Sequence, residues 1–269
     1  MNSLTVLSGK DNKTVKSAAK LISSASARRQ AGEFLLEGAR LCADAAAAGM
    51  KIKRVFVTEK ALADYKEYVD TLLLAANEGY TVTPELFGKL CDTVSPQGVA
   101  AVVEMTQSGP ANINPQGMYI ALENMQDPAN LGAVARTAEA LGISGIIISK
   151  SSCDPYSPKA QRAAMGSLLR LPVIVAEEFI PLMQKLQGEG MTVCATVIKN
   201  ADETLGNYKF SKRSVVMIGN EGNGLTSEAI ALADKKITIK MAGRNESLNA
   251  SAAAALFMWE MMKGNADGR

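Results

Sequence analysis

The sequence, of 269 residues, contains no histidine. This absence excludes catalytic sites in which a histidine activates a serine or cysteine nucleophile, and it excludes zinc sites with histidine ligands. Histidine is also the one side chain whose unperturbed pKa lies near neutral pH. Any proton transfer that the protein catalyses near pH 7 must therefore use other groups.

Long apolar runs and paired cysteines are missing as well. No run approaches the roughly 18 apolar residues that a membrane-spanning helix needs, and residues 1–5 lack the apolar core of a secretory signal. The four cysteines lie far apart and form no C-x-x-C pair, which indicates free thiols in a reducing compartment. We therefore expect a cytoplasmic protein with no metal site and no membrane partner.

The net charge of +2 is small, but the charges are unevenly distributed along the chain. Residues 1–60 contain eleven Lys and Arg against five Asp and Glu, whereas residues 61–110 contain two against seven. A basic N-terminal block can neutralise phosphates and release their counterions, as RNA-binding domains do. The alternative is a solvated helix face without a partner.

Residues 106–117 contain two prolines, two glycines and no charge, which predicts a linker between two domains, 1–105 and 118–269. In the first domain helical and strand patterns alternate, as in a small α/β domain. The expected helices cover 12–27, 38–48 and 62–77, and the expected strands cover 54–58, 80–82 and 99–104.

The second domain has Val- and Ile-rich apolar runs separated by helical segments, which predicts a mostly parallel sheet with helices on both faces. A final helix is expected over 248–262, with Leu256 and Trp259 on its buried stripe and with Trp259 packed either in the core or at an interface. Sites in such sheets gather where the strands end. The expected strands are 118–122, 145–149, 171–175, 191–196, 214–218 and 236–240.

The segment after the first of these strands reads D-P-A-N-L-G-A-V-A-R-T-A from Asp127. Asp127 and Pro128 predict the start of a helix. Asn130 then lies in the first turn, where free backbone N–H groups can hold an anion. Arg136 is expected to project away from the core, either toward a ligand or as an ordinary solvated arginine.

Two more segments follow later strands. After 214–218 comes G-N-E-G-N-G-L, whose glycines permit close backbone approach to a ligand, and Glu221 lies within it. It matches neither the dinucleotide fingerprint nor a phosphate-binding loop with lysine. After 236–240 comes M-A-G-R-N-E-S-L-N-A-S, where Ser247 and Asn249 either cap the last helix or take part in a site.

These three segments, in this order and at strand ends, resemble the motifs of the SpoU/TrmH family of RNA ribose methyltransferases, part of the SPOUT class. The resemblance covers roughly 118–262, and 154–167 is similar to the family's stretch between its first two motifs. The basic N-terminal part, with F-L-L-E-G-A-R at 34–40, is similar to the substrate-binding domain of many members. That domain resembles a ribosomal protein that binds kink-turn RNA.

The resemblance implies a trefoil-knotted catalytic domain, a homodimer with active sites completed across its interface, and S-adenosylmethionine as methyl donor. The reaction would be 2′-O-methylation of an RNA ribose. The two-domain layout and the basic N-terminus favour large-subunit ribosomal RNA. The implied cofactor contacts are Thr196, Gly219, Ile239, Met241 and Leu248, and the implied catalytic set is Asn130, Arg136, Glu221, Ser247 and Asn249.

Within that set, Arg136 would hold the RNA phosphate and the attacking oxygen. A guanidinium does not deprotonate in proteins, so we expect Arg136 to stabilise negative charge while a phosphate or water accepts the proton. Asn130 and Asn249 would orient Arg136 and the nucleotide, Glu221 would fix the glycine-rich loop and Arg136, and Ser247 would orient the ribose.

One departure from the family pattern concerns the cofactor. Lys240 stands where the family usually has proline, which leaves that turn less constrained. Several alternatives stay open at this point. They are a tRNA ribose methyltransferase, an rRNA methyltransferase that confers antibiotic resistance, a non-catalytic RNA-binding module, and an unrelated nucleotide-dependent enzyme that uses the glycine-rich loop.

Overall fold

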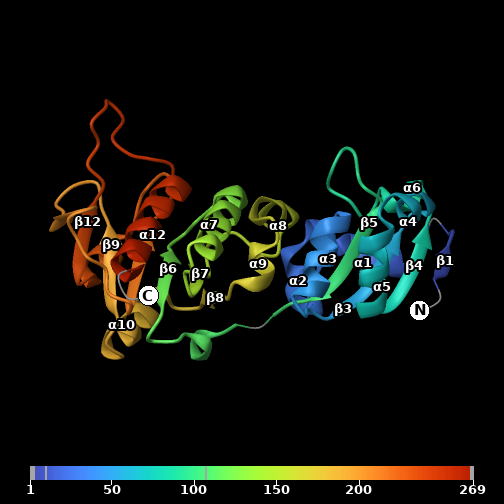
Figure 1. Cartoon of the computed structure of the whole chain (residues 1–269), viewed down its shortest axis with the longest axis horizontal. Helices are drawn as coiled ribbons and strands as arrows, with labels where there is room; N and C mark the ends of the chain where they lie inside the picture. The colour runs from blue at the N-terminus through green and yellow to red at the C-terminus, as the bar shows by residue number, and fades with distance from the viewer. Residues whose placement is uncertain (1–3, 10, 107, 267–269) are drawn as a thin grey trace. The chain divides into compact units, whose positions relative to one another are not determined.

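A computed structural model of the chain (Figure 1) describes residues 4–9, 11–106 and 108–266. It divides into two compact units, one of 1–107 with 156–169 and one of 108–155 with 170–269. The break falls inside the predicted linker, while 156–169, expected in the second domain, groups with the first unit. Residues 1–3 and 267–269 of the predicted domains, and residue 107 of the predicted linker, lie outside the described residues.

The first unit contains a mixed five-stranded sheet in the order β1-β4-β3-β5-β2. The β1, β4 and β3 strands are parallel, and β5 runs antiparallel to both β3 and β2. Two of the strands, β1 and β2, were not predicted from the sequence. The bounds are β1 Thr5–Leu7, β2 Glu33–Glu37, β3 Ile52–Val57, β4 Ala76–Val82 and β5 Val99–Glu104.

Helices cover both faces of this sheet, so the predicted α/β class is correct for the first unit. The single helix expected over 12–27 is two helices, because Ser24 has extended backbone and accepts a hydrogen bond from Ala27 N–H as the cap of the second. The helices are α1 Lys13–Ser23, α2 Ala25–Ala31, α3 Ala39–Ala47, α4 Glu59–Asp64, α5 Lys66–Ala75, α6 Pro84–Phe87 and α8 Pro158–Ala164.

The second unit contains a fully parallel seven-stranded sheet in the order β10-β12-β9-β11-β6-β7-β8. Three strands have the predicted bounds, because each is an apolar run buried on both faces. Only the short β10 was not expected. The strands are β6 Met118–Leu122, β7 Gly145–Ser149, β8 Val173–Ala176, β9 Thr192–Thr196, β10 Glu203–Thr204, β11 Ser214–Ile218 and β12 Lys235–Thr238.

Helices pack on both faces of this sheet as well. The α10 and α11 helices share a buried cluster with one face, and α7 and α12 pack against each other, with α7 on β7 and α12 on β6 and β11. The remaining segments α9 and η1 are short. The bounds are η1 Pro110–Asn112, α7 Pro128–Ala140, α9 Ser167–Arg170, α10 Phe179–Gly188, α11 Ser227–Leu232 and α12 Ala250–Ala266.

The buried face of α12 differs from the prediction. The helix buries Phe257, Met258 and Met261, whereas Leu256 is 43% exposed and Trp259 is 49% exposed. The predicted stripe is therefore wrong for the single chain. The reason is that this helix is apolar on nearly every side, so periodicity cannot choose the face that meets the sheet.

The second unit thus has the mixed α/β architecture expected from the sequence, with a parallel sheet between helical layers. The trefoil threading and the kink-turn-binding likeness stay predictions. No helix among the described residues is long and apolar enough to cross a membrane. Because all strands are parallel, their carboxyl ends lie at one edge of the sheet, and the segments that follow β6, β9, β11 and β12 begin there.

Candidate functional site

A cavity of about 690 Å³ opens at the carboxyl edge of the second unit's sheet. Its lining comes from the ends of β9, β11 and β12, from the loops after β11 and β12, and from α12. The volume lies in the range of small-molecule and cofactor sites. All five predicted cofactor residues line this one cavity, namely Thr196, Gly219, Ile239, Met241 and Leu248.

The glycine-rich loop, residues 219–225, has a conformation that its glycines require. A Cβ atom on Gly219 would lie 2.0 Å from the carbonyl carbon of Gly224, so no other residue fits there. Gly224 has φ +69°, the left-handed region that favours glycine. Asn220 and Gly224 exchange two backbone hydrogen bonds of 3.0 and 2.9 Å. The sequence therefore specifies a tight, closed loop against the cavity.

Side chains from all three motifs meet beside the cavity. Asp127 caps α7 by accepting a hydrogen bond from Ala129 N–H, which places Asn130 in the first helical turn. The Asn130 Nδ2 group donates to Glu221 Oε1 at 2.9 Å, and Asn249 Nδ2 donates to Asn130 Oδ1 at 3.1 Å. Asn130 therefore links the glycine-rich loop to the start of α12.

The Glu221 carboxylate lies among hydrogen-bond donors. Burial disfavours its ionised form, but bonds from the Asn130 amide and from the backbone N–H groups of Glu221, Gln126 and Asp127 outweigh burial. The result is a pKa for Glu221 below the ordinary value. Glu221 is therefore an anionic acceptor at neutral pH, suited to holding donors in place and unsuited to acting as a general base.

Arg136 and Ser247 do not join this cluster within one chain. Arg136 lies six positions after Asn130 on α7, which corresponds to about 9 Å of rise and about 120° of rotation. The Arg136 side chain is exposed, and it has no hydrogen-bond partner among the described residues. Ser247 lines the cavity from the exposed loop after β12. Arg136 is therefore free to meet a ligand or a second chain.

The polar residues that hold the first loop were missed by sequence reasoning. Asn124 has φ +56°, and its carbonyl oxygen accepts a 2.9 Å hydrogen bond from Asn220 Nδ2. Ser152 Oγ accepts from Met125 N–H, and Ser149 Oγ accepts from Asn124 N–H. The cluster of serines after β7 was a usable signal, because it follows a strand at the same edge of the sheet.

In the described part of the chain, this site has neither a reactive cysteine nor a set of metal-binding side chains. Burial, followed by the negative charge of Glu221, raises the pKa of Cys153 to about 11, so its thiol stays protonated at neutral pH. Among the described residues, no group of three or more Asp, Glu, Cys and His side chains could hold a metal ion. Lys240 lines the cavity where the family usually has proline.

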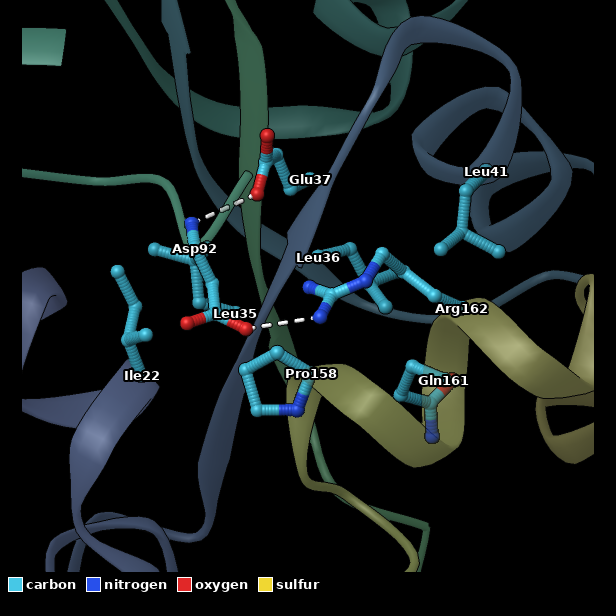
Figure 2. Close-up of a pocket in the computed structure, with 9 residues that line it drawn as sticks. All are labelled: Ile22, Leu35, Leu36, Glu37, Leu41, Asp92, Pro158, Gln161 and Arg162. Carbon is cyan, nitrogen blue, oxygen red and sulfur yellow. Dashed lines mark hydrogen bonds and ion pairs between the residues drawn. The ribbon is translucent and has the colours of Figure 1, made fainter. Parts of the chain in front are cut away.

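A second hollow, in the first unit, is a packing defect. Its volume of about 10 Å³ is barely enough for one water molecule. Figure 2 shows Arg162 of α8 directed at Asp92, with Nη2 and Oδ2 2.8 Å apart, while Asp92 N–H donates to Glu37 Oε2 at 2.9 Å. These bonds hold α8, which lies within the family-like stretch 154–167, against β2.

Comparison with known proteins agrees with this geometry. The model of the SpoU rRNA methylase family matches residues 117–259, and that of the MRM3-like substrate-binding domain matches 12–101. The chain is 34% identical to an uncharacterised tRNA/rRNA methyltransferase of Synechocystis, covering 87% of this chain and 85% of that protein. It is 28% identical to the 23S rRNA (uridine(2479)-2′-O)-methyltransferase of Streptomyces viridochromogenes, with coverages of 93% and 89%.

A solved structure of an rRNA methyltransferase resembles the chain over nearly all of its length. The AdoMet-bound rRNA methyltransferase of Sinorhizobium meliloti superposes with a TM-score of 0.85 at 29% identity, covering 97% of this chain and 98% of that one. The chain therefore belongs to the SpoU rRNA methylase family.

Proposed function

We propose that the protein transfers a methyl group from S-adenosylmethionine to the 2′-hydroxyl of a ribose in RNA, with large-subunit ribosomal RNA as its substrate. One observation supports this most directly. The Asn130, Glu221 and Asn249 cluster lies beside a single cavity that all five predicted cofactor residues line. Membership of the SpoU family and the names of the relatives point to the same reaction. Ribosomal RNA as substrate would place the protein in the cytoplasm.

The cavity suits S-adenosylmethionine in size and in lining. Its volume of about 690 Å³ lies in the range of small-molecule and cofactor sites, and the glycine-rich loop forms one wall. Thr196, Gly219, Ile239, Met241 and Leu248 would hold the cofactor. When bound, the cofactor supplies a methyl group on a positively charged sulfur that leaves readily. We further propose that the loop at 239–249 is the knotted segment that closes over it.

The chain's own residues would supply placement and charge. Arg136 would bind an RNA phosphate and stabilise negative charge on the attacking oxygen, because its guanidinium stays protonated. Asn130 and Asn249 would orient Arg136 and the nucleotide, since they are hydrogen-bonded to each other and Asn130 bonds Glu221, which lines the cavity. Placement of this kind lowers barriers by about 7–11 kcal/mol in the best cases. A phosphate oxygen or water would accept the proton.

We also propose that two copies associate through α12 and α7. Leu256 and Trp259 lie exposed on α12, which packs beside α7, the helix that carries Arg136. An exposed Trp and Leu on one helix are typical of interface residues that a partner covers. Arg136 has no partner among the described residues of its own chain, so it would reach the Asn130 and Glu221 cluster of the second copy.

The substrate is tested by methyl transfer from labelled S-adenosylmethionine to total rRNA and to tRNA, followed by mapping of the modified ribose. We expect label in large-subunit rRNA and a strongly reduced rate for Arg136→Lys at unchanged cofactor affinity. Predominant labelling of tRNA would replace the proposed substrate. Failure to bind S-adenosylmethionine at millimolar concentration would indicate a non-catalytic RNA-binding module.

The shared active site is tested by mixing two inactive variants, Arg136→Ala and Glu221→Ala. If each site combines residues of both copies, half of the mixed dimers' sites carry no substitution, and about a quarter of the activity returns on random mixing. No recovery after subunit exchange would show that each site uses Arg136 of its own chain.

A further inference from the structure

Glu123, the first residue after β6, has a buried carboxylate that lies outside the cluster described above. Glu123 is 5% exposed. Its backbone N–H donates to Ile218 O at 2.9 Å, which continues the β6–β11 pairing by one residue. A buried carboxylate is costly unless donors compensate its charge. The groups that donate hydrogen bonds to the Glu123 carboxylate therefore show which segment Glu123 holds in place.

Both donors come from Thr226, the residue that directly follows the glycine-rich loop. Thr226 N–H donates to Glu123 Oε2 and Thr226 Oγ1 donates to Glu123 Oε1, each at 2.8 Å. Thr226 Oγ1 also accepts from Ala229 N–H and so caps α11. A carboxylate that accepts two hydrogen bonds from one residue fixes both the position and the orientation of that residue.

The loop between Gly219 and Thr226 is thus held at both ends. Gly219 directly follows β11, whose position the sheet sets, and Thr226 is bound to Glu123. Between them, Asn220 bonds the Asn124 carbonyl and Glu221 bonds Asn130. Every residue from Gly219 to Leu225 lines the cavity. The shape of that wall therefore depends on the Glu123–Thr226 contact.

We propose that Glu123 is a positioning residue for the cofactor-binding wall and that it acts through Thr226. This inference rests on the proposed function of the cavity. Loss of either partner would let the end of the glycine-rich loop move away from β6. Cofactor affinity would fall, although neither side chain is among those that line the cavity.

The experiment measures the dissociation constant of S-adenosylhomocysteine by calorimetry on the full chain, with the unfolding temperature recorded for each variant. Glu123→Gln and Thr226→Val are each expected to weaken binding about tenfold, which is the loss of one hydrogen bond to a charged group. Thr226→Ser keeps both donors and is expected to bind within about twofold of the unaltered protein. The double variant Glu123→Gln, Thr226→Val is expected to lose no more than the weaker-binding single variant.

A matched control separates positioning from general stability. Asp234 Oδ2 accepts a 2.8 Å hydrogen bond from Val193 N–H in the same sheet. This bond lies at the amino-terminal ends of β9 and β12, away from the cavity at their carboxyl ends. Asp234→Asn is therefore expected to lower the unfolding temperature and leave the dissociation constant unchanged. Tight binding by both Glu123→Gln and Thr226→Val would overturn the inference alone. Absence of binding by the unaltered protein would overturn the proposed function, and the inference with it.

Discussion

Two loops at the carboxyl ends of strands in the same sheet each form a wall of the cavity, and they are held in different ways. The glycine-rich loop is bonded to itself through Asn220 and Gly224 and to the first motif through Glu221. In residues 239–248, the long red-orange loop of Figure 1, no hydrogen bond involves a described residue of that stretch. Both loops are largely exposed, so hydrogen bonding, and not burial, distinguishes them.

This difference in hydrogen bonding indicates that the glycine-rich loop has its shape before the ligand binds, and that the loop at 239–248 becomes ordered when the ligand binds. A segment with solvated backbone and few buried contacts opens at low free-energy cost. Ordering that segment on a ligand consumes part of the binding free energy. We therefore expect substitutions in the glycine-rich loop to have large effects, and matched substitutions in the loop at 239–248 to have small ones.

The largest expected effect is that of Gly219→Ala. The added Cβ would lie 2.0 Å from Gly224 backbone, which cannot move without opening the loop. We expect the free energy of unfolding to fall by about 3 kcal/mol and cofactor affinity to fall roughly 100-fold. Chemical denaturation and calorimetry measure the two quantities.

Gly243→Ala is the matched control in the other wall. A Cβ on Gly243 meets no atom within 4 Å, and no left-handed φ is required there. The expected change in unfolding free energy is within about 0.5 kcal/mol. Equal losses from the two alanine substitutions would contradict the distinction between the walls.

The next effect concerns two glutamates, one in each wall. Glu221→Gln removes the negative charge that accepts from Asn130 and from the backbone of the first motif. We expect the methyl-transfer rate to fall roughly 10- to 100-fold, the range for losing hydrogen bonds to a charged group. Glu246 is exposed and has no hydrogen-bond partner among the described residues, so Glu246→Gln is expected to keep most of the activity. A larger loss for Glu246→Gln would reverse the assignment of the two walls.

Most strands of the second unit and part of the cavity lining could be predicted from the sequence, whereas most contacts that hold the glycine-rich loop could not. The strands β6, β7 and β11 were predicted to the residue, because each is a short apolar run that is buried in the sheet. The five residues predicted from the family motifs as cofactor contacts all line the cavity. The bond between Glu123 and Thr226 joins residues 103 apart, and periodicity carries no information about such a partner. The buried face of α12 was missed because this helix is itself apolar on nearly every side.

Limited proteolysis gives a smaller, direct measure of the same difference. A protease specific for glutamate can cut after Glu246 in the unbonded loop and after Glu221 in the bonded one. We expect cleavage at Glu246 first, and a rate about tenfold lower when S-adenosylhomocysteine is present at tenfold its dissociation constant. Mass spectrometry identifies the cut. Unchanged cleavage at Glu246 with saturating ligand would show that this loop does not close over the cofactor.

The smallest effect is the pH dependence of the bonded wall, and it has a definite sign. The pKa of Glu221 is lowered because hydrogen bonds from Asn130 and the nearby backbone outweigh burial. A group with a lowered folded-state pKa stabilises the fold above its unfolded pKa, near 4.3 for glutamate, and loses this contribution as pH falls through the folded value. The unfolding free energies of the unaltered protein and Glu221→Gln should therefore differ at pH 7 and converge in acid. A difference that instead vanished between pH 7 and 5 would mean that burial raises this pKa, and the donors of the first motif would then not hold the glycine-rich loop through its charge.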